Sequence, residues 1–148
     1  VGGENLQDER FIEPKQTSVE SRHFDEVIEG MFDVFEKGTA RYSRHDSIQM
    51  CGKTGTAENP HGQDHSIFIA FAPKDDPKIA IAIIVENGYW GSRWAAPIAS
   101  LITEQYLTGK ITRPAMEKKM FEGNLDEEYQ KQFEEIYARK LSDTIHEE

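Results

Sequence analysis

Residues 66–86, SIFIAFAPKDDPKIAIAIIVE, decide the fold of this chain. Two apolar runs, residues 66–72 and 78–86, are separated only by PKDDP at positions 73–77. Apolar runs of this length, bounded by turn residues, predict strands. A five-residue connection cannot cross over a sheet, so the two strands must be antiparallel neighbours. Because both runs are apolar nearly throughout, we expect both faces of the sheet to be covered.

Helical periodicity on either side of this hairpin supplies elements that can cover it. Apolar side chains recur at helical spacing over residues 22–37, and Gly38 stands where a left-handed C-terminal cap is expected. A second amphipathic helix is predicted over residues 93–107, closing at Gly109. Residues 47–57 predict a further strand, at the edge of the sheet. The predicted fold class is therefore α+β, a short antiparallel sheet with packed helices.

The C-terminal part has a different character. Residues 113–148 are rich in charge, and Asn124 followed by Glu127 forms a capping pattern. An amphipathic helix over about residues 126–140 is predicted from the apolar positions Leu125, Tyr129, Phe133, Ile136, Tyr137 and Leu141. We therefore divide the chain into residues 1–112, which carry the sheet, and a charged helical tail. If the two long helices cover only one sheet face, we expect self-association, or shielding of the sheet by this tail through Leu125, Phe133 and Ile136.

Composition excludes several classes of protein. The 148 residues correspond to one domain, and 27 acidic against 17 basic residues give a net charge of -10, which disfavours nucleic acid as a partner. The longest apolar run, residues 79–85, is far shorter than the about 20 residues of a membrane-spanning helix. The single cysteine, Cys51, excludes an internal disulfide.

The stretch with the clearest chemical potential is residues 51–59, CGKTGTAEN. Lys53 supplies a positive charge, Thr54 and Thr56 supply hydroxyl donors, and Gly55 leaves room for a second backbone. This combination predicts a carboxylate receptor beside a strand edge, to which an extended peptide can add. Period two places Lys53 and Gly55 on one face and both threonines on the other, so a ligand must approach at the edge.

Two neighbouring features have competing interpretations. His61, Asp64 and His65 include the ligand types of a zinc site, but a polar hairpin turn explains them as well, and no metal is assigned. Cys51 lies two residues before Lys53, yet no partner that would lower the pKa of its thiol can be named. A buried strand cysteine is the preferred interpretation.

Three aromatic residues, Tyr89, Trp90 and Trp94, surround a pair of glycines after the hairpin. They predict either a rim for substrate or a seal between this loop and the second helix. The sequence leaves both alternatives open.

The wider context of the Lys-Thr-Gly motif resembles the class B penicillin-binding proteins, and within them the elongation-type penicillin-binding protein 2 branch. The matching segments are Glu29-Gly30-Met31, Gly38-Thr39-Ala40, residues 52–58, Phe71-Ala72-Pro73, Ala80-Ile81-Ala82 and Glu86-Asn87-Gly88. The resemblance covers about residues 10–110. It implies a partial penicillin-binding or β-lactamase-like transpeptidase domain, with residues 1–112 as its C-terminal portion.

That family brings together three motifs, Ser-x-x-Lys, Ser-x-Asn and Lys-Thr-Gly. This chain contains only the third, since none of its serines has Lys three positions on. The resemblance implies that Lys53 holds the proton network and that Thr54 and Thr56 bind the substrate carboxylate. It also implies that the Thr56 backbone N–H serves the oxyanion hole, and that Gly55 lets the stem peptide lie against the strand.

The implied function is serine-type D,D-transpeptidation of peptidoglycan stem peptides during cell elongation, with β-lactams as acylating ligands and without a cofactor. The chain alone is expected to be inactive, because it lacks the nucleophile. The resemblance implies a glycan polymerase and the cell-shape complex as partners, and a membrane-anchored protein on the periplasmic side of the inner membrane, of which this chain is a soluble part. Two alternatives stay open, a β-lactam sensor domain and a non-catalytic module that binds a partner through its tail.

Overall fold

The computed structural model describes residues 16–127, 129–131 and 133–135. Its described residues form one sheet of three strands, β1 (Cys51–Ala57), β2 (His65–Ala72) and β3 (Ile79–Val85), in the order β1-β2-β3. Both neighbouring pairs are antiparallel, with Phe68 of β2 opposite Thr54 on one side and Ile83 on the other. The α+β class and the antiparallel hairpin are confirmed.

The first strand is shorter than the sequence predicted. It begins at Cys51, whereas Ile48 forms only an isolated bridge with His45. In this register β1 starts opposite Phe71, near the end of β2, and the chain then continues into Pro73, which has no N–H for a ladder. The segment before Cys51 therefore has little strand to pair with.

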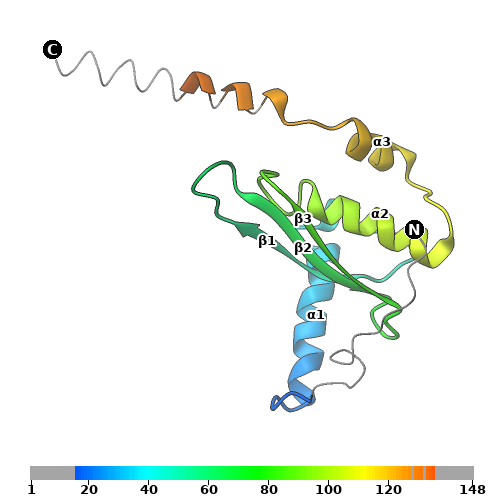
Figure 1. Ribbon diagram of the computed structural model, residues 1–148. Coiled ribbons are helices and arrows are strands. Elements are labelled where there is room, and N and C mark those ends of the chain that lie inside the picture. The colour runs from blue at the N-terminus through cyan, green and yellow to red at the C-terminus, as the bar shows by residue number, and fades with distance from the viewer. Residues whose placement is uncertain (1–15, 128, 132, 136–148) are drawn as a thin grey trace, which may run out of the picture.

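Two long helices pack on the sheet, and both were predicted within two residues of their ends. Helix α1 (Arg22–Glu36) packs mainly against β1, and α2 (Ala95–Thr108) packs against β2 and β3. Figure 1 shows α2 lying along the sheet while α1 runs away from it at a steep angle. Helix α2 ends at Gly109 with a left-handed φ of 77°, as predicted.

The predicted left-handed cap at Gly38 is wrong. Helix α1 ends at Glu36, and among the described glycines only Gly109 has a positive φ. Gly38 instead folds back on the helix, where its N–H donates to the Asp33 carbonyl at 2.8 Å. A Cβ on Gly38 would lie 2.8 Å from the Val34 Cα, so glycine is required by close approach rather than by its φ.

The hydrophobic core lies between the sheet and the two helices. Phe35 of α1 and Phe68 of β2 are both buried and meet edge to face, with ring centroids 5.6 Å apart. Small side chains bring α2 close to the strands, and the core is completed by Ala40, Ile48, Met50, Ala70, Ala72, Ala95, Ala96 and Ala99. The short helical turn η2 (Arg41–Ser43) connects α1 to this core.

The described residues cover the other face of the sheet only beside α1, where Cys51, opposite Phe71, is buried, so most of this face is open, contrary to the expectation from its apolar strands. Ile69 is 48% exposed and Ile84 is 66% exposed, and they alternate with the buried positions of β2 and the half-buried positions of β3. Next to α1 this face carries a shallow hollow lined by Met31, Ile69, Ala70, Phe71, Ala80, Ile81 and Ala82. The rest of this face is open because α2 packs on the opposite face of β2 and β3.

The C-terminal segment contains one helix that the sequence analysis did not predict, α3 (Pro114–Glu122). Pro114 occupies its first turn, where a missing N–H is tolerated, and Gly123 follows its end. Gly123 packs on the ring of Trp94, since a Cβ there would lie 2.4 Å from the indole. In the part of the chain that the structure describes, no helix has both the length and the apolarity to cross a membrane.

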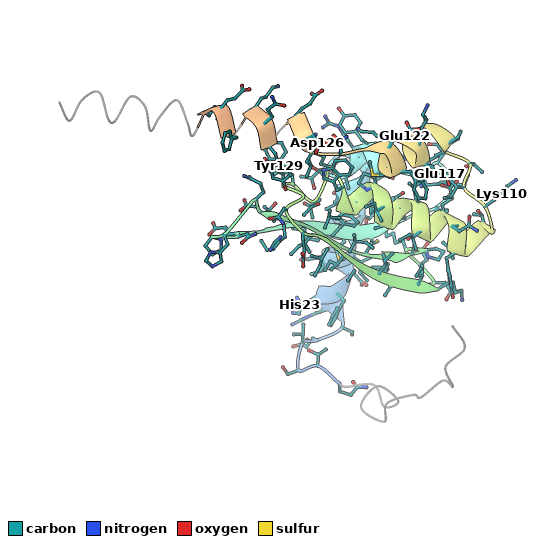
Figure 2. All side chains as sticks on the ribbon, turned by 45° about the horizontal axis from the view of Figure 1, so that its top comes forward. His23, Lys110, Glu117, Glu122, Asp126 and Tyr129 are labelled. Carbon is teal, nitrogen blue, oxygen red and sulfur yellow. The ribbon has the colours of Figure 1, made fainter. Side chains whose placement is uncertain are left out.

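The predicted tail helix is present in its described residues, from Asp126 on, but those described residues do not shield the sheet. Tyr129 and Asp126 are labelled on this segment in Figure 2. The Tyr129 hydroxyl donates to the Asn87 carbonyl at 3.0 Å, and its ring lies 6.2 Å from that of Tyr89. Phe133 is 71% exposed, so its predicted contact with the sheet is wrong. Ile136, Tyr137 and Leu141 lie outside the described residues, and the division at residue 112 stays a prediction.

A buried ion pair joins α2 to the segment before α3. Glu104 is fully buried, and its carboxylate accepts hydrogen bonds from the Thr112 N–H at 2.6 Å and from Arg113 Nε at 2.9 Å. Arg113 also donates to the Ser43 carbonyl at 3.1 Å and to Ser100 Oγ at 2.9 Å. The guanidinium therefore links η2, α2 and the start of α3.

The ionisation of Glu104 follows from these contacts. Burial alone would raise the pKa of the carboxyl, but the hydrogen bonds from Thr112 and then Arg113 outweigh it and lower the pKa to about 2. Glu104 is thus a buried anion paired with a partly buried cation.

Candidate active site

Strand β1 carries the Lys-Thr-Gly motif at an end of the sheet, because β2 is its only neighbour among the described strands. Lys53 lies opposite Ile69 and Thr54 opposite Phe68, so their side chains leave the strand on different faces, as period two predicts. The Lys53 ammonium nevertheless bends back to the strand, where Nζ donates to the Thr54 carbonyl at 2.9 Å. The positive charge therefore lies beside the backbone of the motif.

A hollow of about 350 Å³ opens beside this edge, between β1 and the C-terminal end of α1. Lys53 and Thr54 line it together with Gly30, Asp33, Val34, Lys37, Gly38 and Thr39. Lys37 is paired with Asp33 at 2.9 Å. The remaining polar side chains that line the hollow are those of Lys53, Thr39 and Thr54. The structure thus brings Lys53 and Thr54 together, whereas Gly55 and Thr56 do not line this hollow.

Gly55 is in contact with a second backbone, but that backbone belongs to the same chain. Gly91, in the loop between β3 and α2, lies so close that a Cβ on it would come within 2.7 Å of the Gly55 carbonyl oxygen and 2.3 Å of the Ile67 oxygen. The loop is held there by Ser66, whose hydroxyl donates to the Trp90 carbonyl at 2.9 Å and accepts from the Ala95 N–H at 3.2 Å. The loop between β3 and α2 therefore packs directly against the strand that carries the motif.

Cys51 is a buried strand residue, as preferred from the sequence. Burial raises the pKa of its thiol to about 11, with the nearby Lys74 acting in the opposite direction. Its Sγ lies 3.7 Å from the Ile28 carbonyl of α1. A neutral, enclosed thiol is a poor nucleophile, so Cys51 packs rather than reacts.

The residues of the alternative metal site hold the hairpin loop instead. The Asn87 N–H donates to His65 Nδ1 at 3.0 Å, which occupies that nitrogen as an acceptor. Asp64 Oδ1 accepts from the Asn59 N–H at 3.4 Å, and the His61 N–H donates to Asn59 Oδ1 at 3.1 Å. The described residues contain no group of three metal-ligating side chains.

The aromatic residues of the loop divide between the two predicted roles. Trp94 is 8% exposed and sits under Gly123, so it seals the loop against the body of the protein. Trp90 is 64% exposed, with its ring 6.4 Å from that of Tyr89. A substrate rim at Trp90 stays a prediction.

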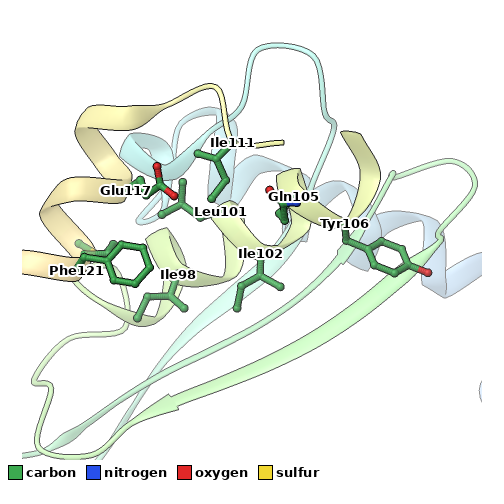
Figure 3. Close-up of a pocket in the computed structure, with 9 residues that line it drawn as sticks. Ile98, Leu101, Ile102, Gln105, Tyr106, Ile111, Glu117 and Phe121 are labelled. Carbon is green, nitrogen blue, oxygen red and sulfur yellow. The ribbon is translucent and has the colours of Figure 1, made fainter. Parts of the chain in front are cut away.

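A larger cavity, about 590 Å³, lies between α2 and α3 (Figure 3). It is lined by Ile98, Leu101, Ile102, Gln105, Tyr106, Ile111, Glu117, Met120 and Phe121. These side chains are mainly apolar and do not include a nucleophile with a neighbouring base, so chemistry is better placed at β1.

Comparison with known proteins assigns the chain to a family. Residues 6–104 match the sequence model of the penicillin binding protein transpeptidase domain. The chain belongs to this family. The match includes α1, the whole sheet and most of α2, and it confirms the resemblance seen in the motifs.

Its relatives within the penicillin binding protein transpeptidase family point to the penicillin-binding protein 2 type. The peptidoglycan D,D-transpeptidase MrdA of Acinetobacter baumannii is 37% identical over 101 residues, which are 58% of this chain and 15% of that protein. The structure of Pseudomonas aeruginosa PBP2 in complex with WCK 5153 is 34% identical, with a TM-score of 0.58, over 67% of this chain and 23% of that one. An imipenem acyl-enzyme of penicillin-binding protein A from M. tuberculosis is 34% identical, with a TM-score of 0.56, over 64% and 21%.

This chain thus spans about 15% of the length of the curated relative MrdA.

One residue at the candidate site was missed by reasoning from single positions. Thr39 belongs to the matching Gly38-Thr39-Ala40 segment, but the sequence gives no sign that it reaches Thr54, which lies 15 positions later. Only the packing of α1 against β1 shows this contact.

Proposed function

We propose that this chain is part of a peptidoglycan D,D-transpeptidase, which cross-links stem peptides by serine acyl transfer and is acylated by β-lactams. The observation that carries the proposal is the placement of Lys53 and Thr54 beside one hollow, on a strand with a free edge among the described residues. A carboxylate at this edge would meet a fixed positive charge and a hydroxyl donor. The curated name of MrdA and the imipenem acyl-enzyme of a similar protein support it.

Each residue of the motif has a role in this proposal. Lys53 stabilises negative charge and holds the proton network around the serine, while Thr54 and Thr56 donate to the terminal carboxylate of the stem peptide or β-lactam. The Thr56 N–H supplies one donor of the oxyanion hole. Gly55, without a side chain, lets the ligand lie against the strand.

The nucleophile must come from outside these 148 residues, because none of their serines is followed by Lys three positions on. The chain alone should therefore form no covalent adduct with a penicillin. Intact-mass measurement tests this directly, and a stoichiometric adduct on the 148-residue chain would show the assignment of roles to be wrong.

The wider setting is part of the same proposal. We place the protein in cell elongation, on the periplasmic side of the inner membrane through a membrane anchor, with a glycan polymerase and the cell-shape complex as partners. The names of the relatives favour a transpeptidase over a β-lactam sensor.

The decisive experiment is Lys53→Ala in the full-length protein, followed by the rate of acylation with a fluorescent penicillin. We expect a loss of about 100-fold or more, since a charge aimed at the reacting group is removed. Lys78→Ala is the matched control, because Lys78 is an exposed lysine of the β2–β3 turn paired with Asp76. Equal rates for Lys53→Ala and the unmodified protein would return Lys53 to the role of a solvated edge residue.

A further inference from the structure

Thr39 is held in a fixed position although it lies outside every helix and strand. On its two sides, the Gly38 N–H donates to the Asp33 carbonyl at 2.8 Å and the Ala40 N–H donates to the Val34 carbonyl at 2.9 Å. Ala40 is 1% exposed and packs in the core. The backbone of Thr39 is therefore anchored to the end of α1 on both sides, while its own side chain faces the hollow beside β1.

The hydroxyl of Thr39 lies 3.0 Å from the hydroxyl of Thr54. This is the hydrogen bond that the structure gives to the Thr54 side chain, since Lys53 Nζ binds the carbonyl oxygen of Thr54 and not its hydroxyl. Either hydroxyl can donate in this pair when no ligand is present. The two residues lie on separate elements, so the contact ties the position of α1 to that of the motif.

A bound carboxylate removes this ambiguity, because an ionised carboxylate accepts hydrogen bonds and donates none. If Thr54 gives its one proton to the ligand, it has none left for Thr39 and accepts from Thr39 instead. The chain of donors then runs from Thr39 to Thr54 and on to the carboxylate. Each bond in such a chain polarises the next.

We propose that Thr39 is a positioning residue for the carboxylate site, donating to Thr54 Oγ1 so that the Thr54 proton points to the ligand. The inference rests on the proposed function, in which Thr54 binds the carboxylate of the stem peptide or β-lactam. Thr39 itself need not touch the ligand. Its effect is on the recognition of the carboxylate, not on the acyl transfer step.

The test compares Thr39→Val with Thr39→Ser in the full-length protein. Valine has nearly the shape of threonine without the hydroxyl, while serine keeps the donor. With a penicillin bearing its free carboxylate, Thr39→Val should lower the second-order acylation rate about 3- to 10-fold, the range for one hydrogen bond. The loss should lie in binding before acylation, and Thr39→Ser should restore the rate to within about twofold of the unmodified protein.

Two comparisons separate this role from a general effect on the fold. The first uses the methyl ester of the same penicillin, which lacks the carboxylate, and Thr39→Val should leave its slower acylation unchanged. The second repeats Thr39→Val in a Thr54→Val background, where the loss should vanish because its only route is gone. A structural role for Thr39 would instead slow acid and ester alike and would add to Thr54→Val.

Each outcome decides something. Unchanged acylation in Thr39→Val, equal losses for acid and ester, or additive losses with Thr54→Val would each overturn the inference while leaving the proposed function intact. A full-length protein that no penicillin acylates would instead overturn the proposed function itself, and the inference with it. Should Thr39→Val unfold, Thr39→Ala removes the same hydroxyl with a smaller side chain and takes its place in the acid, ester and Thr54→Val comparisons, with the same expected results.

Discussion

Replacing Glu104 by glutamine should destabilise the protein by about 3 kcal/mol near neutral pH. The substitution keeps the size of the side chain and removes its charge. Arg113 would then be left as a partly buried cation without its anion, although its bonds to the Ser43 carbonyl and Ser100 remain. Arg113 binds one carboxylate oxygen of Glu104, and the other oxygen accepts from both the N–H and the hydroxyl of Thr112. The imidazole of His45 lies 3.3 Å from that second oxygen. An amide nitrogen in either position would face another donor.

The magnitude follows from the ionisation of Glu104. A pKa lowered from 4.5 to about 2 corresponds to about 3 kcal/mol of stabilisation of the ionised form in the folded state. Breaking a buried ion pair by removing one partner costs a similar amount, about 3–5 kcal/mol. Because the pKa is lower in the folded protein than in the unfolded one, this contribution is fully present above about pH 4.5 and disappears as the pH falls toward 2.

Urea denaturation, followed through the fluorescence of the buried Trp94, measures both the loss of stability and its dependence on pH. Glu104→Gln should lose about 3 kcal/mol at pH 7, and the difference from the unmodified protein should shrink at about pH 3. Glu122→Gln is the matched control, since Glu122 is 67% exposed and 3.8 Å from Lys118, and it should change stability by less than about 0.5 kcal/mol. A loss below about 1 kcal/mol, or one that is the same at both pH values, would refute the reasoning.

Three further predictions concern β1 and α1. Gly52→Ala should destabilise by about 1–3 kcal/mol in the same urea assay, because its Cβ would lie 2.6 Å from Phe68 Cζ; Gly30→Ala, with nothing within 4 Å, should instead stabilise α1. A stable Gly52→Ala protein would show that Phe68 can move aside. Cys51 should react with iodoacetamide only after unfolding, since it is buried and the pKa of its thiol is raised to about 11. Native labelling as fast as that in denaturant, measured by intact mass, would contradict this burial.

The sheet and the long helices could be predicted because each depends on local signals. The hairpin follows from two apolar runs joined by PKDDP, and the end of α2 follows from Gly109, which has the left-handed φ expected of a C-cap. Gly38 offered the same signal after α1, yet its glycine is needed for contact with Val34 and not for its φ. The sequence does not distinguish these two reasons for a glycine.

Contacts between distant segments could not be predicted. Glu104 is one of several acidic residues in the sequence, and nothing in its spacing from Arg113 indicates a buried pair. The same holds for the hydroxyl contact between Thr39 and Thr54, which depends on the angle at which α1 meets β1. At the candidate site, the motif itself was visible from residue types, whereas its support by Gly91 required the path of the loop.

The ion pair at Glu104 also determines where this protein can be cut. The family match ends at residue 104, and a truncation designed on it would remove Thr112 and Arg113 and leave the carboxylate enclosed with no donor from that segment. Ending the chain after Thr112 would keep two of the hydrogen bonds and lose the cation. A shortened version meant for expression or crystallisation should therefore retain Arg113, and with it the first turn of α3, whose Met116 sulfur lies 3.7 Å from the guanidinium. For a soluble, folded preparation the useful C-terminal limit is set by this arginine rather than by sequence similarity.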